Sequence, residues 1–235
     1  MDIQRFIAEM ERIAPPALAE PFDEGRIGLV VEGKPEIERV CSALDLTPRV
    51  LAGARAAGAD MLVVHHTPIW TPVTTVHGRL AGLLKDVLAT GMNVYVMHSN
   101  FDRAPGGIND TLAGILGLED VVPMSLGAVG TCRCDTVKIA RTLGCPLRIY
   151  GDPAPLRSLA VVGGSGFDPG LLHEAEMLRA DAFLSAEARH ATLIATPLTL
   201  LEATHYALEA PGMQRLAERM AWTFLPDPPR IATVP

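Results

Sequence analysis

The sequence predicts a layered α/β fold with mostly parallel sheets, helices on both faces and two similar, intertwined halves. Short apolar runs typical of buried strands alternate with helical stripes along most of the 235 residues. Apolar residues make up 49% and charged residues 20%, a balance that excludes a disordered chain. We therefore expect one α/β unit over residues 1–235, with a lobe boundary near residues 122–128.

Apolar spacing and capping residues predict the elements of the first half. Residues 3–13 carry apolar side chains three and four apart, and two prolines follow them. Thr47 and Pro48 suit the cap and first turn of a second helix. The elements expected here are strands at residues 27–31, 39–44, 61–64 and 93–97 and helices at 3–13, 48–58, 80–90 and 108–116.

The second half repeats the alternation of strands and helices less regularly. The strands expected are 129–134, 147–149, 159–162 and 182–184, and the helices are 136–143, 171–179, 187–195 and 206–220. The Gly-Gly-Ser-Gly segment at 163–166 fits either a tight turn or a backbone cradle for phosphate. It lacks the lysine and serine of a P-loop. The proline-rich residues 226–229 fit a tail.

Charge and cysteine usage narrow the classes of partner and compartment. With 20 basic and 27 acidic residues, the net charge of −7 argues against nucleic acid as a partner. No apolar run approaches the roughly 20 residues that span a bilayer, and residues 1–20 are too charged for a secretory signal. Cys132 and Cys134 lack the C-x-x-C spacing of zinc and redox motifs and fit buried thiols. We expect a cytoplasmic protein without membrane contact.

Three of the seven histidines follow predicted buried strands. His65 and His66 come directly after the strand at 61–64, His98 comes directly after the strand at 93–97, and Asp102 lies four residues beyond His98. In α/β sheets, ligands bind at the carboxyl ends of the strands. If these two strands are neighbours, imidazoles and a carboxylate converge, and this donor set is typical of a metal site. Any one of these histidines alone would more often be structural, and it is their joint placement that favours a metal site.

Two further pairs of residues could contribute to the same chemistry. His205 and Glu209, at spacing i, i+4, share one face of a helix and can bind one centre together. The alternative for this pair is a histidine at a helix start beside a salt-bridging glutamate. Glu187 and His190, three residues apart, fit either an acid/base pair or the solvated start of a helix.

Several segments resemble a known family. They are ADMLVVHHTPIW, VYVMHSNFDRAPGGINDTLA and THYALEAPGM, with LDLTP near residue 44, VVGGSG at 161 and ADAFLSAE at 180. In this order and spacing they resemble the dinuclear metal-centre family named GTP cyclohydrolase I type 2, or Nif-three-like proteins, in its short form without the inserted domain. The chain departs from the family pattern at Thr67, which separates the paired histidines from Pro68.

The resemblance implies two divalent metal ions per chain and a set of residues that handle them. The implied ligands are His65, His66, Asp102, His205 and Glu209, and the implied proton-transfer residues are His98 and Glu187. Because the donors are nitrogen and oxygen only, they leave Zn, Mn, Fe, Co and Ni open.

The resemblance also carries expectations about activity and assembly. It implies a metal-dependent hydrolase that opens the ring of a purine nucleotide such as GTP. The alternative is a non-catalytic, metal-binding regulatory or interaction protein, because a shared site does not impose a shared reaction. The expected partners are a small-molecule nucleotide and further copies of the chain, in a homo-oligomer that is commonly a hexamer.

Overall fold

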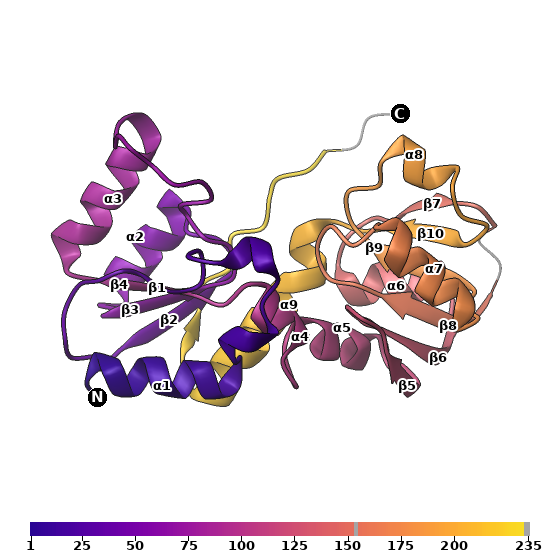
Figure 1. Cartoon of the computed structure of the whole chain (residues 1–235), viewed down its shortest axis with the longest axis horizontal. Helices are drawn as coiled ribbons and strands as arrows, with labels where there is room; N and C mark the ends of the chain where they lie inside the picture. Colours follow the sequence, from indigo (N-terminus) through magenta and orange to yellow (C-terminus); the bar gives the residue numbers. More distant parts are fainter. Residues whose placement is uncertain (153–154, 233–235) are drawn as a thin grey trace. The chain divides into compact units, whose positions relative to one another are not determined.

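The computed structural model describes residues 1–152 and 155–232 of the chain (Figure 1). The chain divides into two compact units, the first made of residues 1–105 and 213–235 and the second of residues 106–212. The first unit thus takes in segments from both ends of the chain, and the second is inserted between them. Both are α/β, so the predicted layered fold is confirmed.

The first unit is built on a five-stranded sheet in the order β1-β4-β3-β2-β11. β2, β3 and β4 are adjacent and parallel, β11 is parallel to β2, and β1 is antiparallel to β4. The elements of this unit are α1 (Ile3–Ile13), η1 (Pro16–Leu18), η2 (Pro21–Asp23), β1 (Gly28–Val31), β2 (Val40–Ala43), α2 (Pro48–Ala56), β3 (Met61–Val64), α3 (Gly78–Thr90), β4 (Asn93–Val96), α4 (Ser99–Arg103) and β11 (Thr223–Phe224). The paired register of β3 and β4 brings their carboxyl ends to one edge of the sheet.

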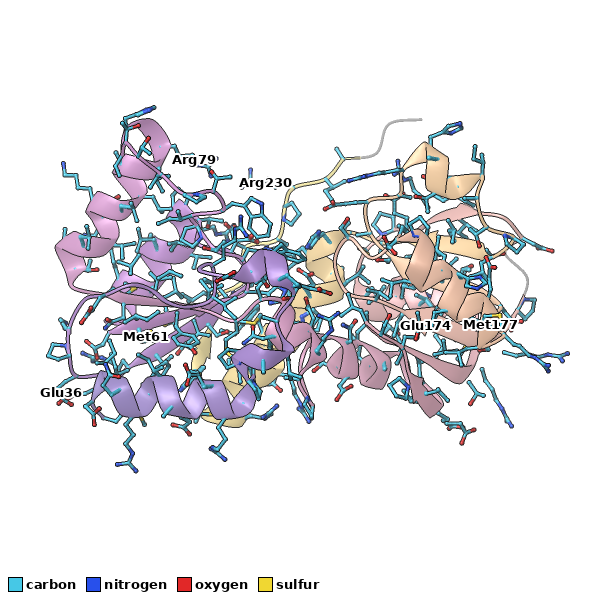
Figure 2. The ribbon with its side chains drawn as sticks, in the orientation of Figure 1. Glu36, Met61, Arg79, Glu174, Met177 and Arg230 are labelled. Carbon is cyan, nitrogen blue, oxygen red and sulfur yellow. The ribbon has the colours of Figure 1, made fainter. Side chains whose placement is uncertain are left out.

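Helices cover both faces of this first sheet (Figure 1). Leu62 and Val64 of β3 belong to an apolar cluster with residues of α2 and α3. On the opposite face, Phe6 of α1 meets Tyr95 of β4 edge-on, with 6.1 Å between ring centroids. Figure 2 shows the fully buried Met61 among the side chains of this unit, whereas Glu36 lies at its exposed edge. A strand buried on both faces explains the unbroken apolar run from 61 to 64.

The second unit contains a six-stranded sheet in the order β5-β6-β8-β9-β10-β7. Its elements are α5 (Ile108–Leu116), β5 (Glu119–Pro123), β6 (Ala128–Cys134), α6 (Thr136–Leu143), β7 (Arg148–Tyr150), β8 (Leu156–Val161), α7 (Pro169–Met177), β9 (Ala182–Ser185), α8 (His190–Leu193), β10 (Thr199–Glu202) and the first half of α9 (His205–Met220). This sheet is mixed rather than mostly parallel. β8, β9 and β10 run parallel, whereas β5–β6, β6–β8 and β10–β7 are antiparallel pairs.

Residues 122–128, where we expected a lobe boundary, lie inside the second unit. They join β5 to β6, and these strands pair antiparallel across the turn, with Pro123 opposite Ala128. A hairpin ties both sides of a turn into one sheet, so the chain does not change units there. The changes occur instead after residues 105 and 212.

α9 begins at His205 and continues to Met220, with Pro211 inside it. Residues 205–212 of this helix belong to the second unit and residues 213–220 to the first. In the part of the chain that the structure describes, no helix combines the length and apolar character needed to cross a membrane.

Candidate metal centre

Polar side chains of the first unit follow the carboxyl ends of β2, β3 and β4. Asp45 comes after β2, His65 and His66 after β3, and His98 after β4. The amides of His65 and His66 both donate to the Leu44 carbonyl at 3.1 Å. The ring centroid of His65 lies 5.0 Å from that of His66 and 5.0 Å from that of His98. The centroids of His66 and His98 are 5.7 Å apart. The expected convergence of three histidines at one edge of the sheet is therefore observed within this unit.

In each of these histidines, Nδ1 is held by an oxygen acceptor. The acceptors are the Met97 carbonyl for His65 at 2.7 Å, Asp45 Oδ1 for His66 at 2.7 Å, and both carboxylate oxygens of Asp23 for His98 at 2.9 Å. Carbonyl and carboxylate oxygens only accept, so Nδ1 carries the proton. In the neutral rings the lone pair then lies on Nε2, the tautomer that suits a metal ligand.

Asp102 adds a carboxylate to this cluster. It lies on α4, which begins directly after His98, and its amide donates to the His98 carbonyl at 3.1 Å. Asp102 Oδ1 is 3.4 Å from Nε2 of the fully buried His65. A lone pair and a carboxylate oxygen repel each other at this distance unless a proton or a metal cation lies between them. The donor pair therefore fits a divalent cation.

Asp23 fixes the position of His98. Its buried carboxylate also accepts hydrogen bonds from the Ser99 amide, at 3.1 Å, and from the Ser99 hydroxyl. Burial by itself raises the pKa of Asp23, but the hydrogen bonds from His98 and Ser99 outweigh that effect, and the pKa lies below its ordinary value. Asp23 is consequently an ionised acceptor that holds the Nδ1–H of His98.

A second cluster lies in the second unit, at the start of α9. His205 Nε2 is 2.9 Å from Glu209 Oε2, the i, i+4 contact that the spacing predicts. His205 Nδ1 is 2.7 Å from Glu187 Oε1, so this ring is oriented in the same way as the histidines of the first unit. Glu209 is buried, with 3% of its surface exposed. Glu187 thus contacts His205, although the resemblance implied proton transfer for it.

The glycine turn after β8 packs directly against the pair formed by His205 and Glu209. Gly164 has a φ of +65°, and a Cβ at this position would lie 2.2 Å from Glu209 Oε1 and 3.2 Å from His205 Nε2. Only glycine both adopts this backbone conformation without strain and leaves room for the carboxylate.

Two amides of this turn, one at each end, bind protein side chains. The Gly163 amide donates to Asn109 Oδ1 and the Gly166 amide to Ser185 Oγ, both at 2.8 Å. A phosphate would have to displace these acceptors. Of the two readings left open by the sequence, the tight strand-to-helix turn therefore describes residues 163–166.

All the implied ligands lie in one of two clusters of buried or half-buried groups that could bind metal. The first unit holds His65, His66, His98 and Asp102, and the second holds His205 and Glu209. Imidazole nitrogen and carboxylate oxygen together suit Zn, Mn, Fe, Co or Ni, so the residues present fit a transition metal.

Asp45 and Asp23 are contacts of these histidines to which the sequence reasoning gave no role. Asp45 had a usable signal, because it follows β2 just as His65 follows the adjacent β3. Asp23 had no such sequence signal, because it lies on a 3-10 turn before the first strand and not at the end of a strand.

The fold and the two clusters define the class of protein: an α/β protein whose histidine and carboxylate groups could bind metal. Within that class, the chain belongs to the Duf34/NIF3 (NGG1p interacting factor 3) family, whose model matches residues 1–226.

Relatives and solved structures agree with this assignment. A Pyrococcus abyssi protein named GTP cyclohydrolase 1 type 2 homolog is 33% identical, in an alignment that covers 83% of this chain and 84% of that protein. A Streptomyces coelicolor protein of the same name is 32% identical, over 94% of this chain and 88% of the relative. The structure of reduced HcgD from Methanocaldococcus jannaschii matches with a TM-score of 0.81 and 26% identity, over 95% of this chain and 96% of that one.

Proposed function

We propose that the two clusters supply the ligands of one dinuclear metal centre, and that this centre hydrolyses a purine nucleotide. The observation that carries the proposal is the common state of the histidine rings. In His65, His66 and His98, Nδ1 bonds to an oxygen acceptor, so the lone pair lies on Nε2 in the neutral ring. In His205, Glu187 contacts Nδ1 and Glu209 contacts Nε2.

The family assignment supports joining the clusters, because its metal-ligand motifs supply all five implied ligands. These ligands are His65, His66, Asp102, His205 and Glu209. A buried carboxylate such as Glu209 offers two oxygens and can serve two ions at once. Divalent ions in such a centre supply Lewis acidity and lower the pKa of water towards neutrality.

The substrate class is proposed from the name of the relatives, GTP cyclohydrolase 1 type 2 homolog. In the proposed reaction, water adds to C8 of the purine and one C8–N bond breaks, which opens the imidazole ring and leaves a formamide. A second water cleaves the remaining C8–N bond, so that C8 leaves as formate and both ring nitrogens become amines. His98 would accept a proton at Nε2 and return it to the leaving nitrogen, since Asp23 holds its other nitrogen. Glu187 would act by orienting His205.

Formate release tests this proposal. Protein loaded with Mn or Zn should release formate from GTP, and His98→Gln should lower kcat by about 10²-fold or more while retaining metal. A loaded protein that releases no formate from any purine nucleotide would contradict the hydrolase proposal.

The second candidate is a metal-binding regulatory or interaction protein without turnover. The family description, NGG1p interacting factor 3, favours it, because that name describes an interaction rather than a reaction. It requires the same metal-binding residues but no proton-transfer role for His98. Full metal content combined with no turnover of any purine nucleotide is the result that would select it.

A further inference from the structure

Two large aromatic side chains lie half exposed next to the histidine cluster of the first unit. Phe22 and Trp70 are 51% and 49% exposed, and their ring centroids are 6.2 Å apart with planes inclined by 47°. Both also contact His98, at centroid distances of 6.1 Å for Phe22 and 5.5 Å for Trp70. Exposed aromatic surface is unfavourable in water, so two such rings against one histidine indicate a surface that a ligand covers.

Neighbouring contacts hold both rings in place. Phe22 directly precedes the buried Asp23, whose carboxylate is bonded to His98. The carbonyl of Trp70 accepts a hydrogen bond from Arg26 Nε at 2.5 Å, and the guanidinium carbon lies 5.3 Å from the indole centroid. This cation–π contact fixes the indole ring, and preorganised groups bind with a smaller loss of entropy.

We propose that Phe22 and Trp70 form a stacking platform for a flat heteroaromatic ring of the nucleobase class, placed beside His98. This aromatic platform rests on the proposed function and names the residues that would bind the substrate. At 6.2 Å the two rings leave no room for a third between them, because two stacking gaps need about 7 Å. A base would therefore lie across their exposed surfaces, within reach of the histidines.

The charge beside the platform favours a nucleotide over a neutral ring compound. The Arg26 side chain lies beside Trp70, and among the described residues its hydrogen bond and its ring contact are both with Trp70. Its guanidinium therefore has donors available for a phosphate group. Aromatic stacking holds the base in a position that does not depend on hydrogen-bond readout.

Tryptophan fluorescence offers a test that does not require turnover. The chain has two tryptophans, and Trp222 stacks on Phe6, so Trp222→Phe leaves Trp70 as the only emitter. GMP should quench this emission saturably in protein as purified or after chelation, whereas ribose 5-phosphate should not. Calorimetric titration of the unaltered protein with GMP gives the same affinity without relying on the Trp222→Phe variant.

Variants of Phe22 separate stacking from general hydrophobic effects. Phe22→Leu should weaken GMP binding by about fivefold or more, and Phe22→Tyr should retain it. Ile194→Ala, at a 75% exposed position in the second unit, is the matched control and should bind GMP normally.

Three results would overturn the aromatic platform. These are GMP affinity unchanged in Phe22→Leu, quenching by ribose 5-phosphate as strong as by GMP, and absence of quenching by GMP in both metal states. If Trp70 emission changes with protein concentration and not with GMP, the rings contact another copy of the chain instead. Quenching by GMP without formate release would contradict only the proposed hydrolysis. Formate release combined with unchanged GMP binding in Phe22→Leu would contradict only the aromatic platform.

Discussion

The histidines of both clusters are oriented by acceptors that are not themselves among the implied ligands. Asp45 holds His66 and Glu187 holds His205, each at 2.7 Å from Nδ1. Such a carboxylate fixes the tautomer and raises the basicity of the ring, so its loss weakens metal binding by about 10- to 100-fold. We expect Asp45→Asn and Glu187→Gln to show this loss in competition with a chelator.

The control for these two variants is Glu38→Gln, since the Glu38 side chain is exposed and lies outside both clusters. It should leave metal affinity unchanged. Equal metal affinity in Asp45→Asn, Glu187→Gln and Glu38→Gln would show that Asp45 and Glu187 do not support the metal-binding histidines.

Gly164 gives a second prediction at the residue scale. A Cβ there would lie 2.2 Å from Glu209 Oε1, so Gly164→Ala should displace this carboxylate and lower metal content. Gly144→Ala is the matched control, because Gly144 has nearly the same φ, +64°, with nothing within 4 Å of an added Cβ. Both variants carry the backbone strain of a positive φ, and only Gly164→Ala should lose metal. Equal metal content in the two would contradict the role of Gly164.

How much of the site could be predicted depends on whether the contacting residues belong to a regular sequence pattern or are brought together only by the folded chain. The histidines after β3 and β4 were predictable, because adjacent parallel strands place their carboxyl ends together. The contact between Asp23 and His98 joins residues 75 apart in sequence and follows no periodic pattern. Only the folded chain reveals it.

At the scale of elements, Asp60 ties β2, β3 and the segment before them together. Its carboxylate accepts from the amides of Glu38 and Arg39, at 3.2 and 3.1 Å, and from Lys34 Nζ at 3.1 Å. Burial alone raises the pKa of Asp60, but hydrogen bonds from Arg39, Lys34 and Glu38 outweigh it and lower the pKa. A lowered pKa in the folded state stabilises the protein above the unfolded pKa, and this stabilisation disappears as pH falls through the folded value.

We therefore expect Asp60→Asn to lower the free energy of unfolding at pH 7 by about 1–3 kcal/mol. The difference from the unaltered protein should shrink below about pH 4, where the aspartate begins to gain a proton. Urea titrations across this range provide the measurement. The exposed Asp86→Asn on α3 is the control and should change little. If the loss in free energy of unfolding caused by Asp60→Asn did not change with pH, the lowered pKa of Asp60 would not be the source of the stabilisation.

Elements with a clear period or cap were predictable, whereas β10, β5 and α4 were not. The predicted helix at residues 3–13 is α1, and Thr47 caps α2 by accepting from the Val50 amide. β10 is a short apolar run without alternation, which a pattern cannot distinguish from a buried helix. All residues of β5 are exposed, and α4 has only five residues, so neither shows a burial period.

At the scale of the whole molecule, we propose that the chain assembles into a homo-oligomer, commonly a hexamer in the family it resembles. Light scattering should then give a mass near six times the 25.1 kDa of one chain. A mass of 25.1 kDa at micromolar concentration would contradict assembly.

The central proposal is that His65, His66, Asp102, His205 and Glu209 hold one dinuclear centre, and elemental analysis of protein purified without chelator tests it most directly. We expect about two equivalents of a transition metal per chain, lost in both His66→Ala and Glu209→Ala. Glu218→Ala, at an exposed position on α9, should keep them. No metal even after reconstitution with Mn or Zn, or full metal content in either ligand variant, would contradict the claim.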